Sequence, residues 1–316
     1  MTLRLVARFL LTALLAGLVI PAGAQSPPGL APATAPAAAA PAAAPAARHY
    51  LWEVSSLTNR IYLYGTVHAG KASFYPLPEP VGKAFAESKI LAVEADITNV
   101  EAMAKSSPAM LLTPPETLAT TIPAPVYERF RRQLARFAIP EAQLAPLKPF
   151  IAASMLAFAE WGRQGYLPQY GVDLHLLTRA HAEGKRVVEL EGTDEQTALM
   201  TSLDEEQQLQ AFEGTLLALE RGITRDQITG LVNAWQSGDA ALLLEVMRAY
   251  HESVPGAKAL EEKFIWSRHE AMAGKIEKWL LDGRDRVFVA VGALHLAGPR
   301  GLVELLRKRG YMVRQL

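Results

Sequence analysis

Residues 60–70 read RIYLYGTVHAG, and residues 286–298 read RVFVAVGALHLAG. Each stretch is a short run of β-branched and aromatic residues, which predicts a strand, and each passes through a glycine with a histidine three positions later. This pattern predicts His68 and His295 just beyond the carboxyl ends of two strands. Ligands of open α/β sheets bind at that edge. The repeated Gly-x-x-His pattern therefore predicts one site that both histidines share.

The segments beside the first motif predict how the sheet starts. Residues 49–55 and 60–65 flank a turn and predict an antiparallel hairpin. A helix over 81–88 then leads into a strand over 90–94. A strand–helix–strand unit predicts a parallel pair with a right-handed crossover.

The rest of the chain is mostly helical until the second motif. Periodicity predicts helices over 126–137 and 149–162, a helix from Asp173 to Gly184, a strand over 186–190, helices over 194–281 broken near Gly222, Gly238 and Pro255, a strand over 287–291, a helix over 301–309 and a strand over 311–315. We therefore predict an α/β fold whose mixed central sheet is built from both chain ends, with a large helical middle segment that flanks and caps it.

The N-terminal residues have the composition of a targeting segment. Residues 1–24 combine two early arginines, an apolar run and a small-x-small cleavage site, which predicts a signal peptide and a periplasmic or secreted protein. The apolar run is shorter than the about 20 residues of a membrane span, although a retained anchor stays an alternative. Residues 25–48 are rich in Ala and Pro and predict a disordered linker. Residues 49–316 then form a single domain, large enough to bury a core without disulfides, since the chain has no cysteine.

The charge of the chain is balanced. It has 32 basic (Lys and Arg) and 32 acidic (Asp and Glu) residues, and no basic stripe or polybasic tail. Nucleic-acid binding requires such a concentration of positive charge. We therefore predict no nucleic acid among the partners.

One carboxylate completes a candidate metal site with the two histidines. Glu94 ends an apolar strand, and if that strand lies beside the first, Glu94 and His68 share one sheet edge. His68, Glu94 and His295 together form a ligand set suited to a divalent Mn, Co, Fe or Zn ion. The alternative is that these residues have structural roles, in which each histidine bonds to a loop carbonyl and Glu94 forms a salt bridge with an arginine.

Two further acidic residues have less certain roles. Glu191 follows the strand over 186–190, so it either reaches the same edge or lies on the surface before a helix that Thr193 and Gln196 begin with a capping box. Asp173 is predicted as the N-cap of the next helix rather than as a catalytic residue.

Arg268 is the candidate cation of the site. It lies on a helix predicted over 259–281, on or beside the inward face defined by Ile265, Met272, Ile276 and Trp279. An inward-facing arginine either neutralises a carboxylate or holds a substrate carboxylate or an oxyanion.

Several short motifs, in this order and spacing, resemble the TraB/GumN family. They are residues 64–68 (YGTVH), 75–78 (YPLP), 93–96 (VEAD), 171–173 (GVD), 190–191 with Gln196, 291–296 (VGALHL) and 301–302, and the likeness runs from about residue 52 to 313. The family is similar to the Tiki proteins, which are metal-dependent proteases, and to a wider superfamily with erythromycin esterase-like and ChaN-like haem-binding members. This resemblance implies an α/β core with the site at the strand ends.

Carried over by position, the resemblance implies that His68, Glu94 and His295 are the metal-binding or catalytic residues. Arg268 matches the arginine of an Arg-Asn pair in the family, but the next residue here is His269. We therefore predict a secreted metal-dependent hydrolase, a peptidase, that acts on a peptide or small molecule. Glu191 would be a general base or further ligand, and Arg268 would stabilise the oxyanion. The alternative is a non-catalytic periplasmic protein that sequesters a peptide, haem or an exopolysaccharide-related ligand.

Overall fold

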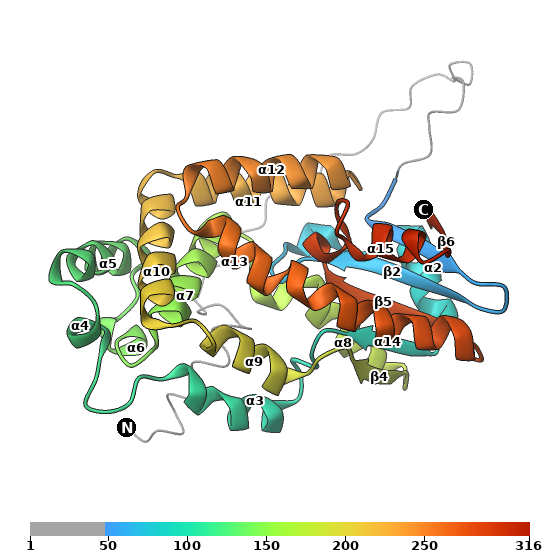
Figure 1. Ribbon diagram of the computed structural model, residues 1–316, viewed down its shortest axis with the longest axis horizontal. Helices are drawn as coiled ribbons and strands as arrows, with labels where there is room; N and C mark the ends of the chain where they lie inside the picture. Colours follow the sequence, from blue (N-terminus) through green and yellow to red (C-terminus); the bar gives the residue numbers. More distant parts are fainter. Residues whose placement is uncertain (1–47) are drawn as a thin grey trace, which may run out of the picture.

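The computed structural model describes residues 48–316. The predicted signal peptide over 1–24 and all but the last residue of the linker over 25–48 lie outside the described residues, so both stay predictions, as does the single domain over 49–316. Figure 1 shows a sheet with helices against it at one end of the molecule and a group of helices at the other. This arrangement confirms the predicted α/β fold with a large helical segment.

The sheet has six strands in the order β4 (Arg186–Glu189), β3 (Ile90–Val93), β5 (Val287–Gly292), β2 (Arg60–Thr66), β1 (Leu51–Ser55) and β6 (Met312–Gln315). β4, β3, β5 and β2 run parallel, while β1 is antiparallel to both β2 and β6. The hairpin of β1 and β2 confirms the predicted one.

The direct pairing of β2 with β3 was wrong, because β5 from the C-terminal end lies between them. β5 can occupy this central position because it is apolar on both faces, and its residues Val287–Val291 are all buried. A parallel strand that is covered on both sides reads as a continuous apolar run. Strands from the two end regions of the chain, β2 and β5, thus pair in the middle of the sheet.

Helices cover both faces of this sheet: α2 (Glu79–Glu87) and α8 (Val172–Ala182) on one, and α14 (His269–Asp282) and α15 (Leu302–Lys308) on the other (Figure 1). Phe85 of α2 packs edge-on against Phe288 of β5, with ring centroids 5.4 Å apart. On the opposite face, Met272 and Ile276 of α14 are fully buried, as their spacing predicted.

The remaining helices form the second part of the molecule. Residues 110–219 contribute a separate apolar cluster that includes Phe130, Leu156 and Phe212, whereas Trp235 and Leu243 belong to the core of the sheet. The helices of this second part are α3 (Val100–Ser106), α4 (Leu118–Thr121), α5 (Ala124–Phe137), α6 (Glu141–Leu144), α7 (Pro149–Arg163), α9 (Thr193–Thr201), α10 (Glu205–Glu220), α11 (Ile223–Gln236), α12 (Ala240–Ser253) and α13 (Ala257–Phe264).

One helix prediction in this region was wrong. The continuous helix over 259–281 is broken: α13 ends at Phe264, a 3₁₀ turn η4 covers Trp266–Arg268, and α14 starts at His269. The break places Arg268 at the end of a tight turn rather than within a helix.

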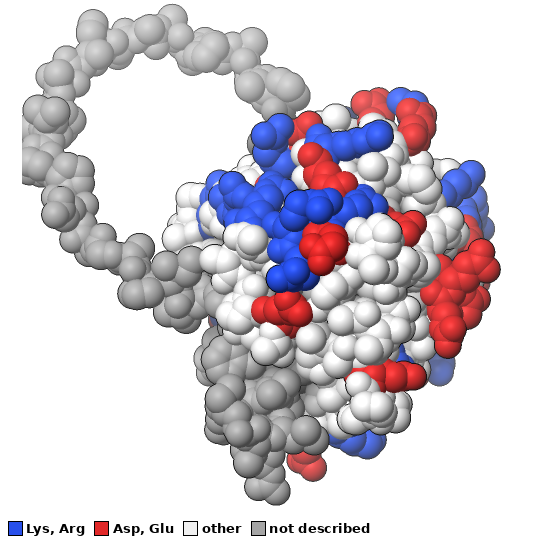
Figure 2. Space-filling model, turned by 90° about the vertical axis from the view of Figure 1, so that its left-hand side faces the viewer, with Lys and Arg blue, Asp and Glu red and all other residues white. Residues whose placement is uncertain are grey.

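Charged side chains of both signs are interspersed on the face of the helical part in Figure 2. Several of its arginines form ion pairs, such as Arg129 with Glu220 (2.7 Å) and Arg136 with Glu160 (2.7 Å). The exclusion of nucleic acid stays a prediction. None of the helices between residues 48 and 316 has the length and apolar character needed to cross a membrane.

Candidate functional site

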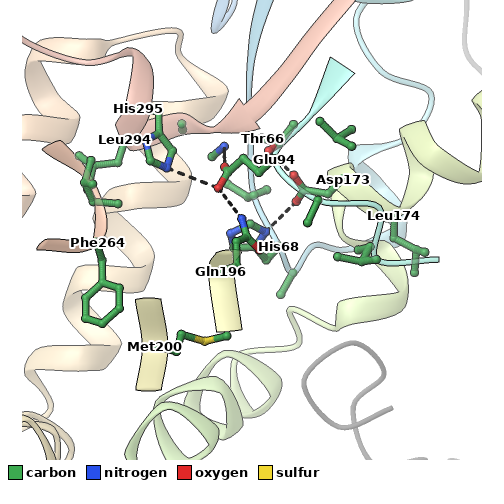
Figure 3. A pocket seen from close by; sticks show the side chains of 18 of the residues that line it. Thr66, His68, Glu94, Asp173, Leu174, Gln196, Met200, Phe264, Leu294 and His295 are labelled. Carbon is green, nitrogen blue, oxygen red and sulfur yellow. Dashed lines mark hydrogen bonds and ion pairs between the residues drawn. The ribbon is translucent and has the colours of Figure 1, made fainter. Parts of the chain in front are cut away.

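The carboxyl ends of the four parallel strands bring the predicted site residues together. His68 follows β2, Glu94 follows β3, Glu191 lies two residues beyond β4, and His295 lies in the 3₁₀ turn η5 (Ala293–Leu296) directly after β5. Figure 3 shows His68, Glu94 and His295 converging from these elements. The strand pattern predicted that the site lies at this edge of the sheet. It did not predict that β5, which leads to His295, lies between β2 and β3.

The glycines of the two Gly-x-x-His motifs have different structural roles. A Cβ on Gly65 would lie 2.3 Å from Tyr50 Cδ1, so glycine is required there for close packing. A Cβ on Gly292 would meet only ordinary contacts: Glu94 Oε1 at 3.4 Å, His295 Cδ2 at 3.6 Å and His68 Nε2 at 3.9 Å. The missing side chain of Gly292 therefore leaves open the point at which the three predicted ligands converge.

Asp173 orients His68. The Asp173 carboxylate accepts a hydrogen bond from the Thr66 hydroxyl and lies 2.9 Å from His68 Nδ1. Its predicted role as an N-cap was wrong: α8 begins at Val172, and Gly171 holds the cap position without a side-chain bond. The carboxylate of Asp173 raises the pKa of His68 to about 9, against the effect of desolvation. With Nδ1 engaged, Nε2 of this 66% exposed imidazole is left for another partner.

Glu94 accepts hydrogen bonds at the centre of a polar cluster, which consists of His68, Glu94, Glu191, Gln196, Arg268 and His295. Its Oε1 accepts from the Gly292 N–H (2.7 Å), and its Oε2 accepts from Arg268 Nη2 (2.6 Å) and Gln196 Nε2 (3.1 Å). Burial alone would raise the pKa of Glu94, but the basic side chains around it hold the pKa well below its usual range. Glu94 is therefore an anion near neutral pH.

Glu191 lies in the same cluster and not on the surface. It accepts from Arg268 Nε (2.7 Å) and Nη2, and from Gln196 Nε2 at 3.4 Å. The capping box of Thr193 and Gln196 was wrong, because Gly192 is the N-cap of α9 and makes no side-chain bond. Gln196 instead turns its amide onto both carboxylates, a role that the capping-box spacing concealed.

Arg268 joins these groups. Its guanidinium bonds to both glutamates, while Nη1 donates to the Phe264 carbonyl (2.8 Å) and lies 3.2 Å from His295 Nε2. The side chains of Arg268, Glu94 and Glu191 are 12%, 13% and 11% exposed. Burial disfavours the charge on Arg268, but Glu191 and Glu94 raise its pKa above its ordinary value, so it remains a cation.

His269 fixes the tautomer of His295. The Arg300 carbonyl can only accept, so His269 Nδ1, at 2.7 Å, must carry the proton. Burial lowers the pKa of His269 to about 4, so this ring is neutral and its Nε2 accepts from His295 Nδ1 at 2.9 Å. Arg268 has donors only, so His295 Nε2 must be the acceptor that faces it. His295 therefore directs a lone pair into the cluster.

The donor chemistry of this cluster fits a divalent transition metal. Both imidazoles turn Nε2 into the cluster while a second group engages Nδ1, as in metal-ligating histidines, and Glu94 supplies the carboxylate. Because Asp173 raises the pKa of His68, a cation would have to displace a proton from His68 Nε2. Within residues 48–316, however, no group of three or more His, Cys, Asp or Glu side chains stands ready to hold a metal ion. Arg268 already engages Glu94 Oε2 and His295 Nε2, so a cation would take over contacts that a guanidinium makes here.

A cavity of about 540 Å³ opens from the cluster toward the helical part (Figure 3). Thr66, His68, Glu94, Arg268 and His295 line its polar end. The other walls are mostly apolar and come from α3, α7, α8, α9, α11 and α12. A volume of this size is typical of small-ligand sites.

The fold and the cluster define the protein as an α/β protein with a polar cluster and a cavity at the carboxyl edge of its sheet, the edge at which open α/β sheets bind ligands. It belongs to the TraB/PrgY/gumN family, whose sequence profile matches residues 50–315. This match confirms the resemblance seen in the motifs.

The chain is similar to the uncharacterized protein YbaP of Escherichia coli strain K12, with 25% identity over 273 residues that cover 82% of this chain and 94% of the relative. It is also 25% identical to Metalloprotease TIKI2 of Danio rerio and 23% identical to Metalloprotease TIKI1 of the same organism, each over 80% of this chain. The aligned part spans 57% and 60% of these two relatives. No solved structure matches the chain.

Proposed function

We propose that this protein is a metal-dependent hydrolase, a peptidase, in which His68, Glu94 and His295 hold one divalent cation, Mn, Co, Fe or Zn. The observation that carries the proposal is the convergence of His68 Nε2, Glu94 Oε1 and the His295 ring on the open point beside Gly292. The names of the two metalloprotease relatives support the reaction class. The signal sequence predicted over 1–24 would place the activity in the periplasm or outside the cell.

Bound there, the cation would polarise the scissile carbonyl and lower the pKa of its attacking water toward about 7. The protein's own groups supply the rest. Asp173 holds the ring of His68 in place, and His269 keeps the His295 Nε2 lone pair directed into the site. Both effects favour ligand basicity and orientation.

Arg268 and Glu191 would act as a pair. In the resting arrangement Arg268 neutralises Glu94 and Glu191. Freed by a cation that takes over Glu94 and His295, the guanidinium would then donate to the developing oxyanion and stabilise that charge. Glu191 is then released from its two bonds to Arg268 and accepts the proton of the attacking water as a general base.

Peptide cleavage tests the proposal. The purified protein, freed of metal by chelation, is incubated with a peptide library and with added Mn²⁺, Co²⁺ or Zn²⁺, and cleavage is followed by mass spectrometry. We expect cleavage that requires the cation and is lost in Glu191→Gln. Cleavage that persists in the chelated protein, or none with any cation, would contradict the proposal.

A second candidate, a protein that sequesters its ligand without turnover, is favoured by the position of Arg268. The Arg268 guanidinium is bound to Glu94 Oε2 and His295 Nε2, the atoms that would have to ligate a catalytic metal ion. Saturable peptide binding with no cleavage under any of these conditions would select this second function, as would binding of haem or an acidic polysaccharide.

A further inference from the structure

A second cavity, of about 300 Å³, lies in the helical part of the molecule between α7, α10, α12 and α13 (Figure 1). Most of its wall is apolar, with Phe150, Val254 and Leu260 among the side chains that line it. Phe264 and Ile265 line this cavity and the 540 Å³ cavity alike, so the second cavity lies behind the apolar wall of the first. Its volume is at the lower end of the range for small-ligand sites.

A buried carboxylate interrupts this apolar wall. Glu261 of α13 lines the cavity, and its side chain is only 8% exposed. Among the described residues its one ion pair is with His251, whose Nε2 lies 2.5 Å from Glu261 Oε2 and which does not line the cavity. A carboxylate has about four acceptor sites, and a buried charge is costly unless it is paired and hydrogen-bonded. One imidazole therefore leaves acceptor capacity on Glu261 for a ligand in the cavity.

A hydroxyl group lines the same cavity. Tyr250 of α12 contributes its side chain to the wall, and no residue between 48 and 316 forms a hydrogen bond with its hydroxyl group. Burial raises the pKa of Tyr250, so this group keeps its proton at neutral pH. The Thr215 hydroxyl, by contrast, donates to the Ala211 carbonyl (2.9 Å). Glu261 Oε2 is enclosed beside His251, whereas Glu261 Oε1 and the Tyr250 hydroxyl group stay accessible.

We propose that the second cavity binds a small amine with a compact apolar body, whose ammonium group bonds to Glu261 Oε1 and to the Tyr250 hydroxyl group. The apolar body would fill the rest of the space. This site is separate from the polar cluster and independent of the peptidase proposal. Phe264 lines the second cavity, and its carbonyl accepts from Arg268 Nη1 (2.8 Å), so the amine would bind beside a residue that positions Arg268.

The polar groups of the cavity favour an amine over other head groups. An ammonium has donors and no acceptor, which matches a carboxylate and a hydroxyl oxygen. Its hydrogen bond to Glu261 would be charge-assisted, and such bonds are roughly twice as strong as neutral ones. A ligand carboxylate would be repelled by Glu261, and an alcohol would bring no charge. A divalent metal ion would need more ligands than one carboxylate and an otherwise apolar wall supply.

Isothermal titration calorimetry of the full chain at neutral pH tests this inference. The probes are 2-phenylethylamine, 2-phenylethanol and 3-phenylpropanoate, which share a phenyl ring on a short chain and differ in the head group. We expect the amine to bind at least tenfold more tightly than the alcohol, the effect of one charge-assisted hydrogen bond. Glu261→Gln should remove this preference, and Tyr250→Phe should weaken amine binding by about threefold to tenfold.

Two further variants make the test specific. Glu262→Gln is the matched control, because Glu262 is 55% exposed, pairs with Arg300 at 2.5 Å and does not line the cavity. Its amine affinity should equal that of the wild type. Ala257→Leu places a larger apolar side chain in the wall of the second cavity, which Ala257 lines, and leaves the first cavity unchanged. It should weaken amine binding at least tenfold, which provides a second test if Glu261→Gln does not fold in thermal melts.

Four results would overturn the inference. They are no measurable binding of the amine, equal affinity for the amine and the alcohol, full amine affinity in folded Glu261→Gln or in folded Ala257→Leu, and the same loss of affinity in Glu262→Gln as in Glu261→Gln. The last result would mean that the amine responds to negative charge on the surface rather than to the carboxylate in the cavity.

Discussion

Replacing Arg268 by alanine tests how the cluster balances its charges. The side chains of Glu94 and Glu191 are mostly buried, at 13% and 11% exposed, and Arg268 forms ion pairs with both of them. Removal of one partner from a buried ion pair costs about 3–5 kcal/mol, because the remaining charge is left uncompensated. A change of 1 kcal/mol shifts the melting temperature of a fold of roughly this size by about 2–4 °C. We therefore expect Arg268→Ala to melt roughly 6–20 °C below the wild type without added metal.

A divalent cation should restore much of this loss. Mn²⁺ or Zn²⁺ can neutralise Glu94 and Glu191 in place of the guanidinium, and a ligand at a hundred times its Kd stabilises by about 2.7 kcal/mol. The melting temperature of Arg268→Ala should rise by several degrees with added cation, as measured by scanning calorimetry. The wild type should gain less, because the cation must first displace Arg268 from Glu94.

Arg136→Ala is the matched control. Arg136 pairs with Glu160 at 2.7 Å, and the Glu160 side chain is only 4% exposed, but this pair lies in the helical part without histidines among its contacts. It should lose stability in the same way and gain nothing specific from the cation. An equal cation response in both variants, or none in Arg268→Ala, would refute the reasoning.

Three further predictions follow from single positions. Gly292→Ala should melt within a few degrees of the wild type but bind the cation at least tenfold more weakly in calorimetric titration. The reason is that the added methyl group fills the point between Glu94 Oε1 and His68 Nε2. Gly274→Ala is the control and should keep full cation affinity, because nothing lies within 4 Å of its added Cβ. Gly65→Ala should lower stability by about 1–3 kcal/mol in denaturant titrations, because its Cβ would overlap Tyr50; an unchanged midpoint would show that this packing is not required. Nitrogen-15 NMR of the imidazoles should place the proton of His295 on Nδ1 in the wild type and give mixed tautomers in His269→Ala. A proton on Nε2 of His295 in the wild type would contradict the hydrogen bond that His295 Nδ1 donates to His269 Nε2.

The strand ends could be predicted because their signal is local. An apolar run, a glycine and a histidine three residues later specify a turn at the sheet edge without reference to the rest of the chain. The apolar stripe of Met272 and Ile276 is local in the same sense. The position of β5 between β2 and β3 depends on pairing between segments about two hundred residues apart, which periodicity does not encode.

The residues that sequence reasoning misassigned have roles set by distant partners. Asp173 has the composition signal of an N-cap, but its carboxylate bonds to Thr66 and His68 more than a hundred residues away. Gln196 likewise fits a capping box, yet it bonds to Glu94. His269 was recognised only as a departure from the family pair, and its effect on His295 follows from the Arg300 carbonyl behind it.

The most direct test of the metal-site proposal is the metal content of three proteins dialysed against the same buffer. Wild type, His68→Ala and His295→Ala are equilibrated with Mn²⁺, Co²⁺ or Zn²⁺, and bound metal is measured by mass spectrometry, with circular dichroism to establish that each is folded. We predict one ion per chain in the wild type and loss of that ion in both variants, because the two Gly-x-x-His motifs supply one shared centre. Unchanged metal content in both variants would contradict it.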